Sequence, residues 1–326
     1  MKSYPKIIDR ILEKIRQCQT ICVVGHLRPD GDCIGSQLAF ALALRKQGKD
    51  VVCWNQDPLP QKYAFLDPNH VVQQPEGSPE FDLVIALDCA SFERLGTIGP
   101  AVEHRKYLIN IDHHQSNTRY GDLNWISDRE ASTGELVFRI LRVAAWPITP
   151  AMADCLFTAV STDTGSFQYS TTKPVTYHTA GELVKLGADL GTVCHEVYQS
   201  FPLSRVRLLK HLYNHFHLTD KDRIAYLWLR NGDFTRSGAD RNDTEGLIDH
   251  IRAFEPVVVA CVFEEVEPEL TRISLRSKSD AVNVNDIAAL FGGGGHRAAA
   301  GARVSGKRLA VQRRVISAIK KALAAT

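Results

Sequence analysis

The sequence lacks the features that mark several protein classes. None of its 8 cysteines forms a CxxC pair, which removes the usual spacing of structural zinc sites and thiol redox motifs. No stretch approaches the ~18 consecutive apolar residues of a membrane-spanning helix, and the N-terminal segment has no apolar core like that of a secretion signal. It also contains no internal repeat and no low-complexity tract. We therefore expect a globular protein of the cytoplasm with reduced cysteines.

The chain also has little net charge. Lys and Arg number 39 and Asp and Glu number 37, giving a net charge of +2. A basic field suited to a long nucleic-acid duplex is therefore not expected, although small anions remain candidate ligands. The 44% of hydrophobic and 23% of charged residues are typical of globular proteins. Because 326 residues exceed what one core usually supports, the sequence predicts two domains.

Short apolar runs alternate with helical patterns from the N-terminus to about residue 190. Ser132 and Glu135 form a capping box at the start of one of these helices. The predicted strands are 20–26, 50–55, 81–88 and 106–114, and the predicted helices are 7–16, 35–48, 132–145 and 150–162. Strands that are apolar throughout are typical of a parallel sheet covered on both faces. The first domain is therefore predicted to be a doubly wound α/β fold.

The pattern changes after a helical segment at 192–219 that contains a proline. We predict this segment to be a linker between a domain at 1–191 and a domain at 220–326. The second domain has predicted strands at 224–229, 256–266 and 270–277, a glycine-rich turn at 291–301 and a final helix at 308–324. These elements predict a smaller α/β domain.

Acidic and histidine residues gather where the predicted strands of the first domain end. They are His26, Asp30 and Asp32 after the first strand, Asp88 after the third, Asp112, His113 and His114 after the fourth, and Asp163 after the helix at 150–162. Because the carboxyl ends of parallel strands share one edge of a sheet, we expect these residues to meet. A single Asp in such a place is more typical of a helix N-cap or a turn. Four such segments in chain order favour a shared site.

The mixture of imidazole and carboxylate groups predicts a site for divalent metal ions such as Mn²⁺, Mg²⁺, Fe²⁺ or Zn²⁺. These segments contain no cysteine besides Cys33 and Cys89, which argues against a structural zinc site. The ligands outnumber what one ion needs, so the pattern fits two ions ~3.5–4 Å apart that share a hydroxide able to attack phosphorus. We interpret Gly31 and Gly35 as residues of the tight turn that points the aspartates inward.

Four segments resemble the motifs of the DHH phosphoesterases, a superfamily that includes RecJ-type exonucleases and type II inorganic pyrophosphatases. They are GHLRPDGDCIGS (25–36), LVIALDCAS (83–91), NIDHHQSN (110–117) and STDTGSF (161–167). SLRS (274–277) and FGGGGHRAAAG (291–301) resemble the companion DHHA1 domain. The resemblance spans nearly the whole chain and implies an active site in the cleft between the two domains.

The resemblance also implies a role for each residue of the first domain. Asp88 would bridge two ions, and the other ligands would be His26 and Asp30 on one ion and Asp32, His113 and Asp163 on the other. Asp112 would orient its neighbours through hydrogen bonds. His114 would contact the substrate phosphate and assist the departure of the leaving oxygen.

In the second domain the resemblance implies substrate contacts. The glycine run is interpreted as a set of unpaired backbone amides that bind an anion. The candidate substrate-binding residues are Arg252, Arg276, Gly293, Gly294, Gly295, His296 and Arg297, with Glu245 and Asp249 beside Arg252.

The compact layout resembles the bifunctional oligoribonuclease and 3′-phosphoadenosine 5′-phosphate phosphatase subgroup, the nanoRNases. This resemblance implies two Mn²⁺ ions, with Mg²⁺ or Co²⁺ as alternatives, and a substrate that is a short single-stranded RNA or DNA or a small nucleotide. Neither a long duplex nor a membrane is expected as a partner. A phosphodiesterase for cyclic di-AMP or pApA and a nucleotide-binding module without catalysis stay open as alternatives, as does a homodimer. The glycine-rich turn argues against a pyrophosphatase, and the chain is too short for the extra domains of a RecJ-type exonuclease.

Overall fold

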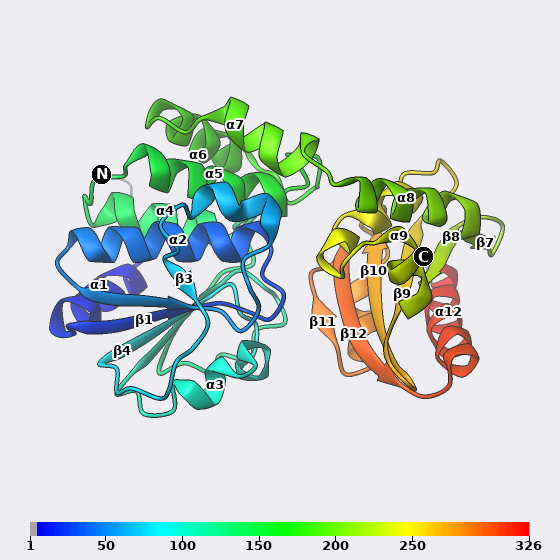
Figure 1. The fold of residues 1–326 in the computed structure, drawn as a ribbon, viewed down its shortest axis with the longest axis horizontal. Helices are drawn as coiled ribbons and strands as arrows, with labels where there is room; N and C mark the ends of the chain where they lie inside the picture. The colour runs from blue at the N-terminus through cyan, green and yellow to red at the C-terminus, as the bar shows by residue number, and fades with distance from the viewer. Residues whose placement is uncertain (1–4, 326) are drawn as a thin grey trace. The chain divides into compact units, whose positions relative to one another are not determined.

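The computed structural model describes residues 5–325, apart from the side chain of Asn242. The chain divides into two compact units, the first ending at Ser200 and the second beginning at Phe201. The predicted linker at 192–219 therefore covers the end of one unit and the start of the other. Each unit contains one sheet with helices packed on it (Figure 1).

The first unit is built on a parallel sheet of six strands in the order β3-β2-β1-β4-β5-β6. Their bounds are β1 Thr20–Val24, β2 Asp50–Trp54, β3 Val72–Gln73, β4 Leu83–Leu87, β5 Leu108–Asp112 and β6 Leu123–Ile126. The predicted doubly wound α/β fold is confirmed. The sequence missed β3, which has two residues, and β6, a strand of four residues (LNWI) with alternating burial.

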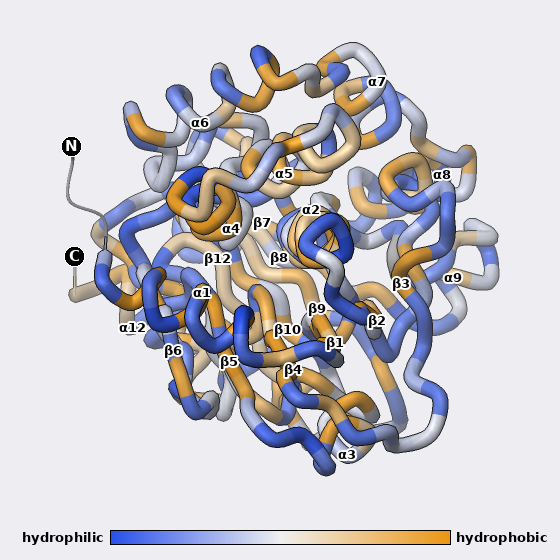
Figure 2. Tube along the Cα trace, turned by 90° about the vertical axis from the view of Figure 1, so that its left-hand side faces the viewer, coloured by the Kyte–Doolittle hydropathy of each residue, from blue (hydrophilic) through white to orange (hydrophobic). Residues whose placement is uncertain are grey.

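Helices cover both faces of this sheet. They are α1 Ile7–Gln17, α2 Gly31–Lys46, α3 Ile98–Ala101, α4 Thr133–Val143, α5 Pro150–Asp163, α6 Pro174–Lys185 and α7 Leu190–Cys194. Alternate strand residues face opposite sides, so Ile21 and Val23 join the core with α1, α2, α4 and α5, whereas Cys22 and Val24 pack with Ile98 of α3. In Figure 2, helix α1 alternates between the hydrophobic and hydrophilic colours.

Helix α2 begins earlier than the sequence suggested. Asp30 is its N-cap, and the Asp30 Oδ1 atom accepts a hydrogen bond from the Cys33 amide at 3.1 Å. The interpretation of Gly31 and Gly35 as turn residues is therefore wrong, because both lie inside the helix. A Cβ atom on Gly35 would overlap the carbonyl oxygen of Cys155 in α5. These glycines instead allow α2 and α5 to pack closely, which keeps the start of α2 near the end of α5.

We expect Gly35→Ala to destabilise the protein by about 1–3 kcal/mol, because the added methyl group must displace the α5 backbone. Urea denaturation would measure the loss. Gly181→Ala in α6 is the matched control, since a Cβ atom there meets nothing within 4 Å, and this change should be neutral or stabilise by up to about 1 kcal/mol. Equal effects of the two substitutions would contradict the packing argument.

The second unit contains a mixed sheet in the order β11-β12-β10-β9-β8-β7, in which only β8 and β9 are parallel. The strands are β7 His217–Thr219, β8 Ile224–Leu229, β9 Val259–Glu267, β10 Leu270–Ser277, β11 Gly294–Gly295 and β12 Ala299–Ser305. One face packs on α11 (Val284–Ala289) and α12 (Arg308–Ala324). The other face packs on α8 (Leu203–His215), α9 (Asn231–Ser237) and α10 (Leu247–Arg252).

The eight cysteines are all free, and seven of them are buried. The expected core position is confirmed for these seven, whereas Cys194 is only partly buried. Within residues 5–325, every helix is either too short or too polar to cross a membrane.

Candidate metal centre

The strand order places three of the predicted segments at one edge of the first sheet. Strand β1 lies between β2 and β4, so the order of the sheet reverses there, and ligand sites form at such switch points outside the carboxyl ends of the strands. His26 follows β1, Asp88 follows β4, and His113 follows the neighbouring strand β5. Asp163 is the last residue of α5. Four segments distant in the chain thus deliver their side chains to one place.

The six predicted metal ligands form two groups that share Asp88. In the first group, the His26 Nε2 atom lies 3.4 Å from Asp88 Oδ2 and 3.8 Å from Asp30 Oδ1. In the second, His113 Nε2 lies 3.1 Å from Asp163 Oδ2, 3.5 Å from Asp32 Oδ2 and 3.5 Å from Asp88 Oδ1. Each carboxylate oxygen of Asp88 therefore faces a different histidine. We call these residues the six-ligand cluster.

Most of the six-ligand cluster is buried. The side chains of His26, Asp32, Asp88 and His113 are almost inaccessible, whereas Asp163 is 26% and Asp30 43% exposed. Burial, together with the nearby Asp88 carboxylate, raises the pKa of Asp32 well above its usual range. Carboxylates held this closely in a buried site require positive charge for stability.

The donor set fits divalent cations. Ligand atoms of Asp32, His113 and Asp163 lie within 4.8 Å of one another, as do those of His26, Cys33 and Asp88. Burial raises the pKa of the Cys33 thiol well above its usual range, and a protonated thiol is a poor metal ligand. The available donors are then imidazole nitrogens and carboxylate oxygens, a set that suits Mn²⁺, Mg²⁺ and related ions.

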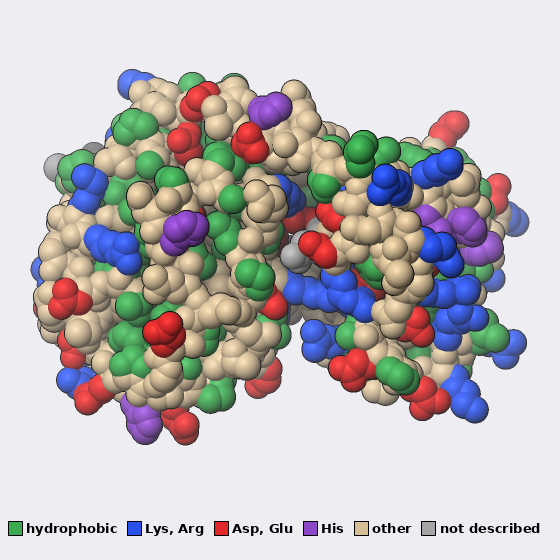
Figure 3. All heavy atoms as spheres, viewed as in Figure 1, with side chains coloured by type: hydrophobic (Ala, Val, Ile, Leu, Met, Phe, Trp, Pro, Cys, Tyr) green, Lys and Arg blue, Asp and Glu red, His purple; other side chains and the backbone are tan. Residues whose placement is uncertain are grey.

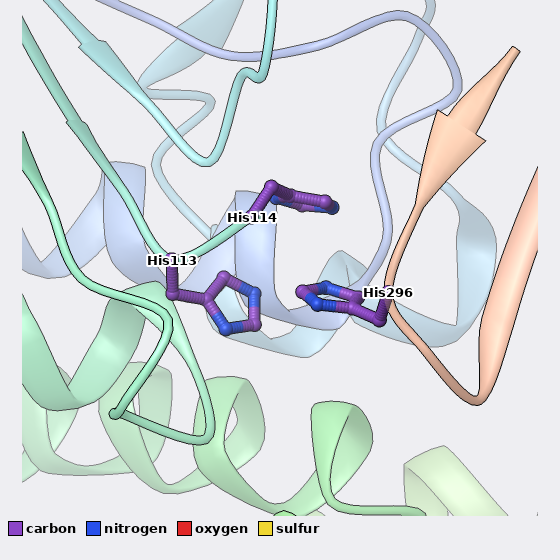
Figure 4. Close-up of side chains that lie close together, drawn as sticks. All are labelled: His113, His114 and His296. Carbon is purple, nitrogen blue, oxygen red and sulfur yellow. The ribbon is translucent and has the colours of Figure 1, made fainter. Parts of the chain in front are cut away.

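Asp112 lies behind the cluster and orients both neighbouring histidines. Its Oδ1 atom accepts hydrogen bonds from the His113 amide at 2.8 Å and from His114 Nδ1 at 2.8 Å. Its Oδ2 atom accepts one from Asn117 Nδ2 at 2.6 Å. Figure 4 shows the two histidine side chains at the end of β5, with ring centroids 4.9 Å apart and ring planes at 68°. This geometry fits an orienting role for Asp112.

Several residues that support the cluster were not among the predicted site residues. Asn117 also donates to Asn110 Oδ1 at 2.8 Å, and Asn110 donates to the carbonyl oxygen of Cys89, directly after Asp88, at 3.2 Å. Both asparagines lie in the NIDHHQSN segment, so their proximity to the histidines was a usable signal. Ser36 donates to Asp32 Oδ1 at 3.1 Å from one helical turn away. Thr133 also contacts the cluster, although it is 101 residues from Asp32 in the chain.

The glycine run of the second unit differs from the expectation. Gly292 has a left-handed backbone (φ +73°), and the amides of Gly292 and Gly293 donate to Ala289 and Ala288 at 3.1 and 3.0 Å. These two amides end α11, so the interpretation of the whole run as unpaired amides is wrong. Gly294 and Gly295 form strand β11, which pairs with β12.

The remaining candidates of the second unit lie near this run or on α10. Arg276 on β10 is opposite Ala299 of β12, and the His296 amide donates to Ala299 O at 2.7 Å in the turn between β11 and β12. The Arg297 guanidinium donates to the Asp280 carbonyl at 2.7 and 2.5 Å. Arg252 Nε lies 3.2 Å from Asp249 Oδ1 on the same helix. The proposed substrate contacts of these side chains stay predictions.

Metal removal should change how stability depends on pH. Burial alone would lower the pKa of His26, but the carboxylates of Asp30 and Asp88 raise it to about 9. In metal-free protein, the protonated imidazole therefore contributes full stability below about pH 6.5, and this contribution is lost as pH rises toward 9. Metal ligands must be deprotonated, so stabilisation by a bound cation grows with pH instead.

We thus expect the Tm of chelator-treated protein to fall between pH 6.5 and 8.5, and the Tm with saturating Mg²⁺ to rise or stay level. Thermal melts at several pH values in each condition would measure this. His26→Gln should reduce the fall in the chelated protein. The same slope with and without Mg²⁺ would contradict the assignment of His26 to a metal site.

Comparisons with known proteins agree with the fold and identify the family. The model described as "DHH family, N-terminal domain" matches residues 20–160, and the DHHA1 domain model matches residues 221–325. The "Bifunctional oligoribonuclease and PAP phosphatase NrnA" of Thermus thermophilus is 32% identical over 312 residues, which cover 93% of this chain and 90% of that protein.

Two solved structures share the fold. The exopolyphosphatase-related protein from Bacteroides fragilis has a TM-score of 0.86 and 25% identity, with 98% of each chain covered. RecJ from Thermus thermophilus, solved in complex with Mn²⁺, has a TM-score of 0.50 and 13% identity over 97% of this chain and 54% of its own. With both domain models matched and a relative 32% identical along nearly its whole length, the chain belongs to the DHH family and carries a DHHA1 domain.

Proposed function

We propose that this protein is a metal-dependent phosphoesterase that hydrolyses short oligonucleotides to mononucleotides and 3′-phosphoadenosine 5′-phosphate to AMP. The observation that carries the proposal is the placement of Asp88 between two histidine and carboxylate groups, with one oxygen 3.4 Å from His26 and the other 3.5 Å from His113. A carboxylate so placed can bridge two cations, for which Mn²⁺ is our first choice and Mg²⁺ or Co²⁺ are alternatives. The name of the 32% identical relative supports this substrate class.

The chemistry that divalent cations supply in such a site is a lower pKa of water, toward about 7, and neutralisation of charge on the phosphate. The residues of the chain have separate roles. The six-ligand cluster would hold the cations, and Asp112 accepts a hydrogen bond from His114 Nδ1 at 2.8 Å. This contact fixes Nδ1 as the protonated nitrogen. The Nε2 atom of His114 is then the group that acts on the phosphate or the leaving oxygen.

The charges of the two units support an anionic substrate. From residue 201 onward there are 20 Lys and Arg against 14 Asp and Glu, whereas residues 1–200 contain 19 against 23. Figure 3 shows many Lys and Arg side chains on the visible surface of the second unit. We propose that the second unit binds the terminal phosphate or base of the substrate, using Arg276, His296 and Arg297. A modest excess of charge suits short substrates, which need few cationic contacts.

A substrate panel tests the proposal. The purified protein with Mn²⁺ is assayed on pApA, a five-residue RNA, a five-residue DNA, cyclic di-AMP and 3′-phosphoadenosine 5′-phosphate, and kcat/KM is compared. We expect the highest values for pApA and the short RNA, with phosphate release from the last compound. A preference for cyclic di-AMP would identify a cyclic-dinucleotide phosphodiesterase instead. Nucleotide binding without turnover of any compound would reject the enzyme.

The free cysteines bear on the compartment in which the protein acts. The eight cysteines are free, which suits a reducing compartment. We propose that the protein acts in the cytoplasm, where short RNA fragments and small nucleotides are present.

A further inference from the structure

Thr133 is the first residue of α4 and contacts two different members of the six-ligand cluster. Its amide donates to Asp32 Oδ2 at 2.7 Å, and its hydroxyl donates to Asp88 Oδ1 at 3.1 Å. Asp32 belongs to the His113 group, whereas Asp88 is shared by both groups. Thr133 therefore links Asp32, which belongs to one group, to Asp88, which both groups share.

The N-terminus of α4 binds a carboxylate. Ser132 caps the helix by accepting from the Glu135 amide at 3.2 Å, which leaves the Thr133 and Gly134 amides directed at Asp32. The Gly134 amide donates to Asp32 Oδ1 at 2.8 Å, so each oxygen of Asp32 accepts one amide hydrogen bond. The positive end of the helix dipole also favours a negative charge there.

The hydroxyl of Thr133 acts on a different carboxylate. Asp88 Oδ1 lies 3.5 Å from His113 Nε2 and 3.6 Å from His114 Nδ1, and Asp88 Oδ2 faces His26. A carboxylate can bridge two cations only if its plane keeps one oxygen toward each. The hydrogen bond from Thr133 Oγ1 restrains that plane. Because Thr133 is fully buried, water does not replace this bond easily.

We propose that Thr133 is a positioning residue that sets the orientation of Asp88 relative to Asp32, so that two cations bind as a coupled pair. The proposal rests on the metal centre of the proposed function and adds a determinant that lies outside the predicted ligands and motifs. Loss of a hydrogen bond to a metal ligand commonly costs about 10–100-fold in metal affinity or activity. The Asp32 contact uses the backbone amide, so it survives a side-chain substitution.

Thr133→Val removes the hydroxyl and keeps the shape of the side chain. We expect calorimetric titration with Mn²⁺ to show one of the two binding events weakened about 10-fold or more. The electron paramagnetic resonance signal of spin-coupled Mn²⁺ pairs should be lost at metal concentrations that saturate the wild-type protein. The kcat should fall about 10–100-fold while KM changes little, and Thr133→Ser should restore the coupled signal.

Thr158→Val is the matched control. Thr158 is also a fully buried helical threonine, and its hydroxyl has no hydrogen-bond partner among the described residues. This substitution should leave Mn²⁺ binding unchanged. If Thr133→Val does not fold, Thr133→Ala, which also keeps the amide contact to Asp32, decides the question by the same titration.

The outcomes separate this inference from the proposed function. Wild-type protein that binds no Mn²⁺ would reject the metal centre itself. Wild-type protein that binds two ions, together with a Thr133→Val protein that binds both equally well and has the same kcat, would reject only the role of Thr133. Weaker binding in Thr133→Val and Thr133→Ser alike would also contradict a role for the hydroxyl.

Discussion

Asp88→Asn is expected to lower kcat about 10³-fold or more and to remove at least one of the two metal ions that the proposed function requires. The amide keeps the size of the side chain but has one weak oxygen donor and no charge, so it cannot bridge two cations. Either His26 or His113 would then face an NH₂ group in place of the carboxylate oxygen that lies 3.4 Å from His26 Nε2 or 3.5 Å from His113 Nε2. Steady-state kinetics with pApA, together with metal analysis after gel filtration, measures both effects.

Asparagine is the suitable replacement because of the backbone. Asp88 has a left-handed conformation with φ +54°, which asparagine tolerates and most other residues do not. Asp128→Asn, at an exposed position before α4, is the control and should keep wild-type kinetics. A correctly folded Asp88→Asn protein with two bound ions and more than a tenth of wild-type kcat would remove Asp88 from the centre of the mechanism.

The strands that carry the cluster could be predicted from sequence because a buried strand appears as a short run of mostly apolar residues. Strands β1, β4 and β5 are buried along almost their whole length and consist mostly of apolar residues, as expected for a sheet covered on both faces. His26, Asp88 and His113 then follow from chain order, since all parallel strands end at one edge. No knowledge of strand order was needed to expect that these side chains meet.

The contacts made by backbone atoms could not be predicted in the same way. The amides that hold Asp32 belong to the start of α4, and nothing in residues 132–134 specifies a carboxylate about 100 positions away. The glycines show the same limit. Gly31 and Gly35 serve helix packing, and Gly292 serves helix termination. A glycine indicates that a side chain is not tolerated, but the sequence does not tell whether a turn, a neighbouring helix or a ligand is the cause.

Glu264→Gln is expected to lower the free energy of unfolding of the second unit by about 2–3 kcal/mol. Glu264 on β9 is 1% exposed and contacts the guanidinium groups of Arg241 and Arg272, the latter directly opposite it on β10. Neutralising one member of a buried ionic group leaves the others without a counter-charge, which costs about 3–5 kcal/mol. The side chains of Arg241 and Arg272 are 32% and 26% exposed, so water offsets part of that cost.

The same substitution also tests the proposed substrate face. Burial alternates along β10, which places Arg272 and the candidate substrate residue Arg276 on the same side of the strand. If that side binds substrate, loss of the Glu264 contact should raise KM for pApA while kcat stays near the wild-type value. Glu267→Gln at the exposed end of β9 is the control and should change stability by less than about 0.5 kcal/mol. If urea denaturation gives the same small change for both variants, the ionic group contributes nothing to stability. If the Glu264→Gln protein is destabilised but its KM is unchanged, this face of the sheet does not bind substrate.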